Sequence, residues 1–183
     1  GYEVVIANTL TNNTTINWSG IYLSFNGGVL INNNLINNST NGILYKYPAG
    51  GTLNNSTGAT FRKFTATGNT SSQIDINNAG TLNVQTGVLD IYSDTLTNTG
   101  AITIAANAIF KNSYVTILNS GSTVSGNGTL QQANVLTVNT PLNLAATTKF
   151  NILSGNVNGS GSMNIAGALS WSGGYLSLPV TLT

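Results

Sequence analysis

The carboxylates are the first residues in this sequence that could do chemistry, because the chain has no cysteine and no histidine. Its four acidic residues are Glu3, Asp75, Asp90 and Asp94. A glycosidase needs two carboxylates on one face, and Asp90 and Asp94 are close enough in sequence to meet across a bend. A calcium site would need more oxygen ligands, which asparagine and backbone carbonyls could add. Solvated carboxylates at corners are the simpler interpretation, so we expect no catalytic residue, no metal site, no cofactor and no enzymatic activity.

The basic residues are as sparse as the acidic ones. They are Lys46, Arg62, Lys63, Lys111 and Lys149. Lys46 and the Arg62-Lys63 pair fall in neighbouring repeat units and could form a weak site for anions or acidic sugars, although isolated solubilising charges are the simpler interpretation. The net charge of +1 gives no electrostatic attraction to nucleic acid, and no apolar run approaches the roughly 20 residues of a membrane span. We therefore expect neither nucleic acid as a partner nor a membrane-spanning segment.

Tyrosine is the residue type best suited to contact a glycan, because its ring is apolar while its hydroxyl seeks water or a partner. The candidate glycan contacts are Tyr45, Tyr47, Tyr92, Tyr114 and Tyr175, and Tyr22 shares their properties.

Six aromatic residues also fall near the same place of their repeat units: Phe25, Tyr45, Phe64, Phe110, Phe150 and Trp171. Equal places stack into a column in a repeat fold, so we expect an aromatic ladder in the core, with an outward platform for sugar rings as the alternative.

Asparagine is frequent and allows two interpretations. Ten asparagines begin an Asn-x-Ser/Thr sequon: Asn12, Asn13, Asn17, Asn37, Asn38, Asn54, Asn55, Asn69, Asn127 and Asn158. Chance alone yields several sequons in a chain this rich in Asn, Ser and Thr, and glycosylation would require export in a glycosylating host. In a stacked fold, asparagine side chains can instead hydrogen-bond to the copies above and below them as ladders.

The elements that must position these residues are short strands that recur with a nearly fixed period. In residues 78–107 a glycine stands two residues ahead of two apolar residues separated by one polar residue, as in Gly80, Leu82 and Val84. This alternation is that of a strand of about three to five residues, and Gly and Asn tolerate the positive φ of the bends between strands. Cutting the chain at intervals of about 20 residues aligns the motifs in these units: 11–30, 31–50, 51–73, 74–95, 96–116, 117–136, 137–156 and 157–176.

Three short strands and three bends per unit predict an all-β fold, a single-stranded parallel β-solenoid (β-helix) of about eight coils of roughly 20 residues. One coil cannot bury its own inward side chains, and stacking on its neighbours does so. Frequent Gly and Asn exclude long helices, whereas an antiparallel β-sandwich is the alternative because it too has short strands at regular spacing. We expect a single domain over 1–183, with an N-terminal strand in 1–10, coils in 11–176 and a C-terminal strand in 177–183.

The repeats resemble the right-handed β-helix regions of large bacterial surface proteins, such as filamentous-haemagglutinin-like adhesins and autotransporter passengers. Residues 76–91 and 96–104 carry the resemblance best, with the form Asn-x-Gly-Thr-Leu-x-Val. The resemblance covers most of the chain but is compositional and periodic, with no diagnostic motif. It implies an extracellular, adhesive or structural role, and it brings no catalytic residues.

The two ends of such a rod leave strand edges unpaired, and the sequence has no amphipathic helix at either end to cover them. The end strands contain the candidate assembly residues Tyr2, Val4, Ile6, Leu178, Val180 and Leu182. We expect these strands to meet other copies of the chain, head to tail, or further repeats of a longer parent chain.

The preferred function is therefore that of a non-enzymatic structural or adhesive building block of a surface adhesin, fibre or sheath, located at the cell surface or outside the cell. Cell-surface or matrix polysaccharide is a further candidate partner. A carbohydrate-binding or carbohydrate-cleaving β-helix, of the kind found in phage tailspikes, is the alternative. Ice binding is the least favoured, because it needs Thr-x-Thr pairs on consecutive coils, and Thr65-Ala66-Thr67 and Thr95-Leu96-Thr97 do not recur in register.

Overall fold

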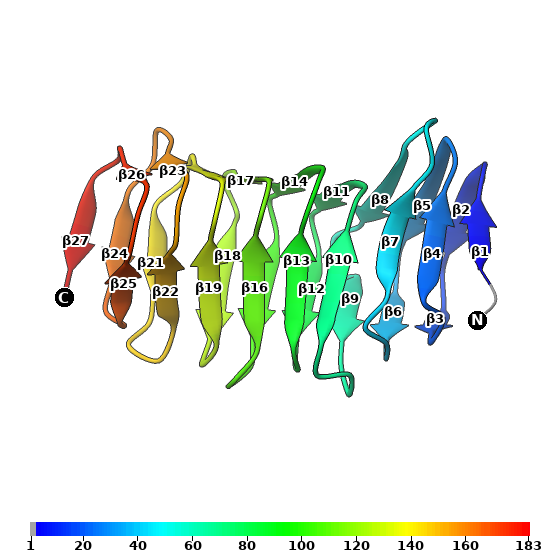
Figure 1. Cartoon of the computed structure of the whole chain (residues 1–183), viewed down its shortest axis with the longest axis horizontal. Coiled ribbons are helices and arrows are strands. Elements are labelled where there is room, and N and C mark those ends of the chain that lie inside the picture. Colours follow the sequence, from blue (N-terminus) through cyan, green and yellow to red (C-terminus); the bar gives the residue numbers. More distant parts are fainter. Residues whose placement is uncertain (1–2) are drawn as a thin grey trace.

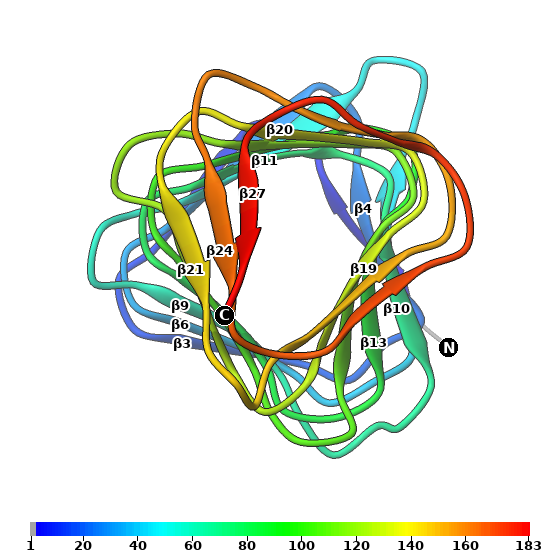
Figure 2. The ribbon, with the colours of Figure 1, turned by 90° about the vertical axis from the view of Figure 1, so that its left-hand side faces the viewer.

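The computed structural model describes residues 3–183 and consists of short parallel strands stacked into a solenoid, as the sequence predicts (Figure 1). It has 27 strands, and every three consecutive strands complete one turn, so the described chain makes nine turns. β1 and β27 lie at opposite ends of the resulting rod. The view along the rod shows the turns stacked around a common axis (Figure 2).

Two of the three faces of the rod are uninterrupted parallel sheets. The first strand of every turn belongs to sheet A, whose strands are β1 (Val4–Ile6), β4 (Tyr22–Phe25), β7 (Ile43–Lys46), β10 (Asn69–Ser72), β13 (Val88–Ile91), β16 (Ile109–Asn112), β19 (Thr129–Gln132), β22 (Lys149–Ile152) and β25 (Leu169–Trp171). The second strand of every turn belongs to sheet B, whose strands are β2 (Thr9–Asn12), β5 (Gly28–Asn32), β8 (Gly51–Asn55), β11 (Asp75–Asn78), β14 (Thr95–Asn98), β17 (Val115–Leu118), β20 (Val135–Val138), β23 (Asn156–Asn158) and β26 (Tyr175–Leu176). These sheets are the continuous walls of the rod.

The third face is divided into two sheets. Sheet C holds the third strands of the first six turns, β3 (Thr15–Trp18), β6 (Leu35–Asn38), β9 (Thr60–Lys63), β12 (Thr81–Val84), β15 (Ala101–Ile104) and β18 (Thr123–Gly126). Sheet D holds those of the last three turns, β21 (Leu142–Leu144), β24 (Met163–Ile165) and β27 (Val180–Leu182). β18 and β21 lie side by side without pairing, so the third wall is interrupted between the sixth and seventh turns.

Side chains alternate between the interior and the surface along almost every strand. In sheet B one inward column contains Leu30, Leu53, Ile76 and Leu96, which are paired in register and at most 1% exposed. Burying a side chain of this kind contributes about 1.5–3 kcal/mol, and one continuous apolar core follows the rod. This confirms that the paired apolar residues of each repeat fill the interior.

The sequence-based expectation was eight coils between two separate end strands. The structure differs in the number of turns and in the end strands, which are parts of turns. β1 and β2 form two sides of a complete first turn, and β27 is the third side of the ninth. The end strands are therefore ordinary members of the sheets, because their backbones pair in parallel like the others.

The expected single column of aromatic residues is wrong. Phe110 and Phe150 do share a buried column, with Leu130 between them. Tyr45 instead pairs with Ser24 on the outer face, and Trp171 pairs with Ile152. Unequal loops cause the difference: Leu44 of β7 pairs with Ser72 of β10, so the third turn is longer than its neighbours and shifts the alignment.

Gly80 and Gly100 allow close stacking of successive bends. The sequence had indicated a different reason for these glycines, a positive φ. Neither has a positive φ, whereas Gly87 does, at 63°. A Cβ on Gly100 would lie 2.1 Å from the carbonyl oxygen of Gly80, and one on Gly80 would lie 2.3 Å from that of Ala59. Successive bends therefore approach too closely at these places for any side chain.

We predict that Gly100→Ala lowers the free energy of unfolding by about 1–3 kcal/mol, because the bend must move away from the preceding coil. Urea unfolding followed by circular dichroism measures the change. Ser120→Ala, at an exposed corner, is the control and should stay within about 0.5 kcal/mol of the parent. Equal stability of Gly100→Ala and the parent would contradict the stacking argument.

Candidate functional site

The carboxylates do not converge on a catalytic pair. Asp90 pairs with Lys111, Oδ2 to Nζ at 3.1 Å, and Asp94 pairs with Lys46, Oδ2 to Nζ at 2.7 Å. The alternative in which Asp90 and Asp94 meet across a bend is therefore wrong, because the two carboxylates form separate ion pairs. Asp75 accepts a hydrogen bond from the backbone N–H of Thr95 at 3.1 Å. Among residues 3–183 no three acidic side chains lie close enough together to hold a metal ion.

Asp90 departs from the expectation of a solvated corner carboxylate. It lies in the middle of β13 with Ser71 and Lys111 as its neighbours on the two adjacent coils, and it is only 2% exposed. Its Oδ1 has no hydrogen-bond partner. Lys111 alone balances this buried charge, which makes the pair a structural contact.

The alternative of a shared face for Lys46, Arg62 and Lys63 is wrong. Lys46 lies on β7 in sheet A, whereas Arg62 and Lys63 are adjacent on β9 in sheet C and point to opposite sides. Arg62 points outward, where its guanidinium lies 4.6 Å from the centre of the Phe64 ring and Nε donates to Asn37 Oδ1 at 3.0 Å. Lys63 points inward and is fully buried. The interpretation of these residues as an anion site is wrong.

Lys63 is the one fully buried lysine of the described chain. Its Nζ donates to the carbonyl oxygen of Ala66 at 3.1 Å and, more weakly, to Thr40 O and Asn41 Oδ1 at 3.4 and 3.5 Å. No carboxylate neutralises it, and desolvation lowers the pKa of Lys63 to about 8. The ammonium is held by two backbone carbonyls and the side-chain oxygen of Asn41.

We predict that Lys63 makes stability depend on pH. Between about pH 8 and the ordinary lysine pKa of 10.5, the unfolded chain keeps a proton that the folded chain has released, so the free energy of unfolding rises with pH. Lys63→Met should abolish this rise and, below pH 8, be more stable than the parent by about 1–3 kcal/mol, since no ammonium is desolvated. Urea unfolding from pH 7 to 9.5 measures both effects. Lys149→Met, at an exposed position, should keep the parent's rise of the free energy of unfolding with pH. Loss of this rise in Lys149→Met would contradict its assignment to Lys63.

Five asparagines form a continuous ladder inside the rod, at the corner between sheets B and C. They are the last residues of successive sheet-B strands and are all buried: Asn12, Asn32, Asn55, Asn78 and Asn98. Each Nδ2 donates to the Oδ1 of the next asparagine at 2.6–2.7 Å. The ladder ends in the sixth turn, where Asn98 donates to the Ser122 hydroxyl at 3.0 Å. This confirms the interpretation of the asparagines as ladders.

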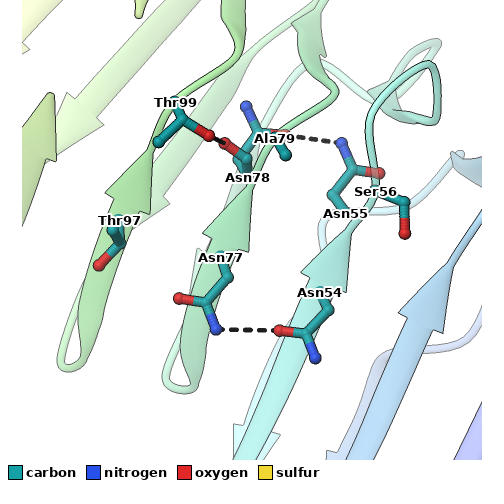
Figure 3. Close-up of a pocket in the computed structure, with 8 residues that line it drawn as sticks. All are labelled: Asn54, Asn55, Ser56, Asn77, Asn78, Ala79, Thr97 and Thr99. Carbon is teal, nitrogen blue, oxygen red and sulfur yellow. Dashed lines mark hydrogen bonds between the residues drawn. The ribbon is translucent and has the colours of Figure 1, made fainter. Parts of the chain in front are cut away.

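A second set of rungs lies outside the same corner (Figure 3). Asn77 Nδ2 donates to Asn54 Oδ1 at 2.9 Å, and Thr97 continues their outward column. These side chains line a shallow groove of about 250 Å³ whose walls carry amides and hydroxyls but no charge and no aromatic ring. Since the amides are already bonded to one another, the groove has a structural explanation and no catalytic group.

We predict that Asn78→Ala lowers the free energy of unfolding by about 1–3 kcal/mol, because it leaves Asn98 Oδ1 buried without its partner and removes one of the acceptors of Asn55 Nδ2. Asn77→Ala is the matched control: it removes an adjacent rung on the exposed face and should cost less than about 1 kcal/mol. Thermal and urea unfolding of both variants measures the difference. Similar losses in the two variants would contradict a special role for the buried ladder.

Three tyrosines and one carboxylate gather on the outer face of sheet A near the first turns. Tyr22 lies 5.8 Å from Tyr45 and Tyr45 lies 5.1 Å from Tyr47, ring centre to ring centre, in edge-to-face contacts of 72° and 89°. The Tyr47 hydroxyl donates to both carboxylate oxygens of Glu3, at 3.1 and 3.2 Å. Together these four side chains line a hollow of about 250 Å³, here called the tyrosine hollow.

The five candidate glycan contacts are thus not one surface. Tyr45 and Tyr47 lie together in the tyrosine hollow with Tyr22, which shares their properties, and with Glu3, which was not among the expected contacts. Tyr22 and Ser24 on β4, and Tyr45 and Tyr47 at the end of β7, follow the two-residue period of an outward strand face, and this pattern could have revealed the group. The other three are single exposed rings: Tyr92 follows β13, Tyr114 precedes β17 and Tyr175 begins β26.

Several of the glycosylation sequons are unavailable in the folded chain. Asn12, Asn38 and Asn55 are at most 5% exposed, and their amides are hydrogen-bonded within the rod. Asn13, Asn17, Asn69 and Asn127 are among the exposed ones. Glycosylation stays a prediction for the exposed sequons only.

The interior of the rod opens at its N-terminal end. A hollow of about 520 Å³ lies there, lined mainly by apolar side chains of the first two turns: Val4, Ile6, Leu10, Ile16, Trp18, Leu23 and Leu30. Leu10 occupies a core column yet is 43% exposed, and the indole Nε1 of Trp18 is buried without a hydrogen-bond partner. At the other end Trp171, Tyr175 and Leu182 are exposed.

The candidate assembly residues lie at these two ends, with the exception of Tyr2, which is outside the described residues. Val4 and Leu182 are more than half exposed, Val180 is half-buried, and Ile6 and Leu178 are buried. Each outermost strand of the described chain pairs on one side only. Residues 3–183 contain no helix with the length and apolar character that crossing a bilayer requires.

Comparisons of this chain with protein-family models, curated proteins and solved structures found no match.

Proposed function

We propose that this chain is a non-enzymatic structural element, a stiff segment of a surface adhesin, fibre or sheath outside the cell. The observation that carries the proposal is the pair of nine-stranded parallel sheets that run through every turn. Backbone hydrogen bonds lie along the rod axis in these sheets, and the asparagine ladder adds side-chain bonds in the same direction. Such an arrangement resists bending and stretching along its length.

The surface chemistry supports the same role. Charged residues make up 5% of the chain, and all four carboxylates are hydrogen-bonded or ion-paired within the rod. The described residues therefore present no free carboxylate pair for glycoside cleavage. On sheet B the pairs Thr9-x-Thr11 and Thr95-x-Thr97 are separated by three coils of other residues, so that face lacks a continuous threonine ladder for ice. The bonded carboxylates and this face of sheet B therefore favour the structural role over carbohydrate cleavage and ice binding.

The ends of the rod define how such segments would join. The proposal is that further β-coils cover the exposed strand edges and Leu10, contributed by other copies or by a longer chain. Sheets A and B run from end to end and offer edges of the same kind at both, which favours continuation by parallel pairing. The third face passes from sheet C to sheet D, so a joining coil must adapt there.

We predict that residues 1–183 self-associate as protein concentration rises, and that Leu10→Glu prevents this by placing a charge in the open end. Leu153→Glu is the matched control, because Leu153 is 44% exposed, like Leu10 at 43%, but lies beside β22 on the flank of the rod. Sedimentation velocity and negative-stain microscopy measure the particle size. A parent chain that stays monomeric at every concentration would refute joining by separate copies, and equal effects of the two variants would refute end-to-end contact.

A further inference from the structure

We propose that the tyrosine hollow, formed by Glu3, Tyr22, Tyr45 and Tyr47, binds a quaternary alkylammonium group such as that of choline. This site is independent of the structural role of the rod. The four side chains come from the segment before β1, from β4 and from the end of β7, so three successive coils build it. The continuous pairing of β1, β4 and β7 fixes their spacing.

The arrangement of the rings favours a compact cation. Tyr45 stands almost perpendicular to both Tyr22 and Tyr47, at 72° and 89°, so the rings enclose a corner and not a plane. A cation is attracted to the faces of aromatic rings, and several rings set at angles to each other are the common means of holding a methylated ammonium. A pyranose, in contrast, stacks on a flat exposed ring, which this corner does not offer.

The size of the hollow also favours a compact cation. Its volume of about 250 Å³ lies below the roughly 300–1,000 Å³ of sites for drug-sized ligands. It can take a trimethylammonium group, and a chain attached to that group can leave through the exposed side, where Tyr22 is 41% exposed. An oligosaccharide would extend beyond the hollow.

The hollow carries one carboxylate, and no lysine or arginine of residues 3–183 pairs with it. Glu3 accepts hydrogen bonds from the hydroxyls of Ser24 and Tyr47, which hold its carboxylate against the rings. Lys46, which lies between Tyr45 and Tyr47 in the sequence, directs its ammonium to Asp94 instead. The hydrogen bond to Glu3 and then the carboxylate charge raise the pKa of Tyr47 above its ordinary value of 10. A permanent cation in the hollow would satisfy this carboxylate without needing a hydrogen bond.

The test is a titration of the full chain with choline, in which the chemical shifts of the tyrosine ring protons are monitored. The uncharged isostere 3,3-dimethylbutan-1-ol has the same shape, and we expect it to bind about tenfold more weakly or worse, because only choline carries the charge. Methyl glucoside, as the sugar probe, should cause no saturable shift. Choline should also lower the raised pKa of Tyr47, since a nearby cation favours the tyrosinate.

Variants separate this site from other exposed rings. Glu3→Gln and Tyr45→Leu should each weaken choline binding by about tenfold or more, whereas Tyr92→Leu, which removes an exposed tyrosine elsewhere, should leave it unchanged. Unchanged circular dichroism establishes that each variant folds. Equal binding of choline and its isostere, saturable binding of the sugar alone, or full binding by Glu3→Gln would each overturn the proposal.

The source of the alkylammonium group is decided by two further probes. Phosphocholine tests a soluble or polymer-linked headgroup, and phosphatidylcholine vesicles test a lipid surface. Binding of either probe that Glu3→Gln weakens supports the site and identifies its source, and failure of both together with choline refutes it.

Discussion

Parallel, in-register stacking of coils is the constraint on which the rest of this structure depends. Every residue of a strand lies about 4.8 Å from the equivalent residue of the next coil. A side chain therefore interacts first with the side chain at the same place of the neighbouring coil. Apolar columns satisfy this arrangement in the interior. Asparagine satisfies it at the inner corner, because each amide carries both a donor and an acceptor and can bond to the amide above and the amide below. Like charges in such a column would repel, which is consistent with a chain in which charge is so rare.

The same constraint explains where the rod departs from its own pattern. Where Lys63 replaces an apolar residue in an inward column, between Asn38 and Val84, its ammonium must reach backbone carbonyls at the bend. Where Asp90 interrupts an outward column, Lys111 of the following coil lies against it. The longer third turn shifts the register of sheet A between β7 and β10, whereas Tyr45 lies on the outside because it pairs with Ser24 of the preceding coil. Lys63 is thus compensated by carbonyls at the bend, and Asp90 by a lysine of the next coil.

These features separate the mechanical part of the molecule from the part available for recognition. The interior is filled and the polar groups near the corners are bonded to one another, so they supply stiffness and little else. The surfaces that can interact are the two ends, with their one-sided strands and exposed apolar side chains, and the tyrosine hollow, where ring faces and a carboxylate are accessible together. The proposed cation site would thus lie near one end of a stiff rod.

The sequence by itself determined the solenoid, its three strands per coil, its filled interior and its asparagine ladders. These follow from local periodicity, because alternation within one strand indicates which side chains point inward, and the repeat length gives the approximate number of residues in each coil. Only the tertiary structure decided that Asp90 and Asp94 bind different lysines and that Glu3 joins Tyr22, Tyr45 and Tyr47. Such contacts join positions on different coils, and their alignment depends on the length of each intervening loop. A difference of a few residues in a loop moves a side chain along the sheet or turns it from one face to the other, so contacts between coils require the folded chain.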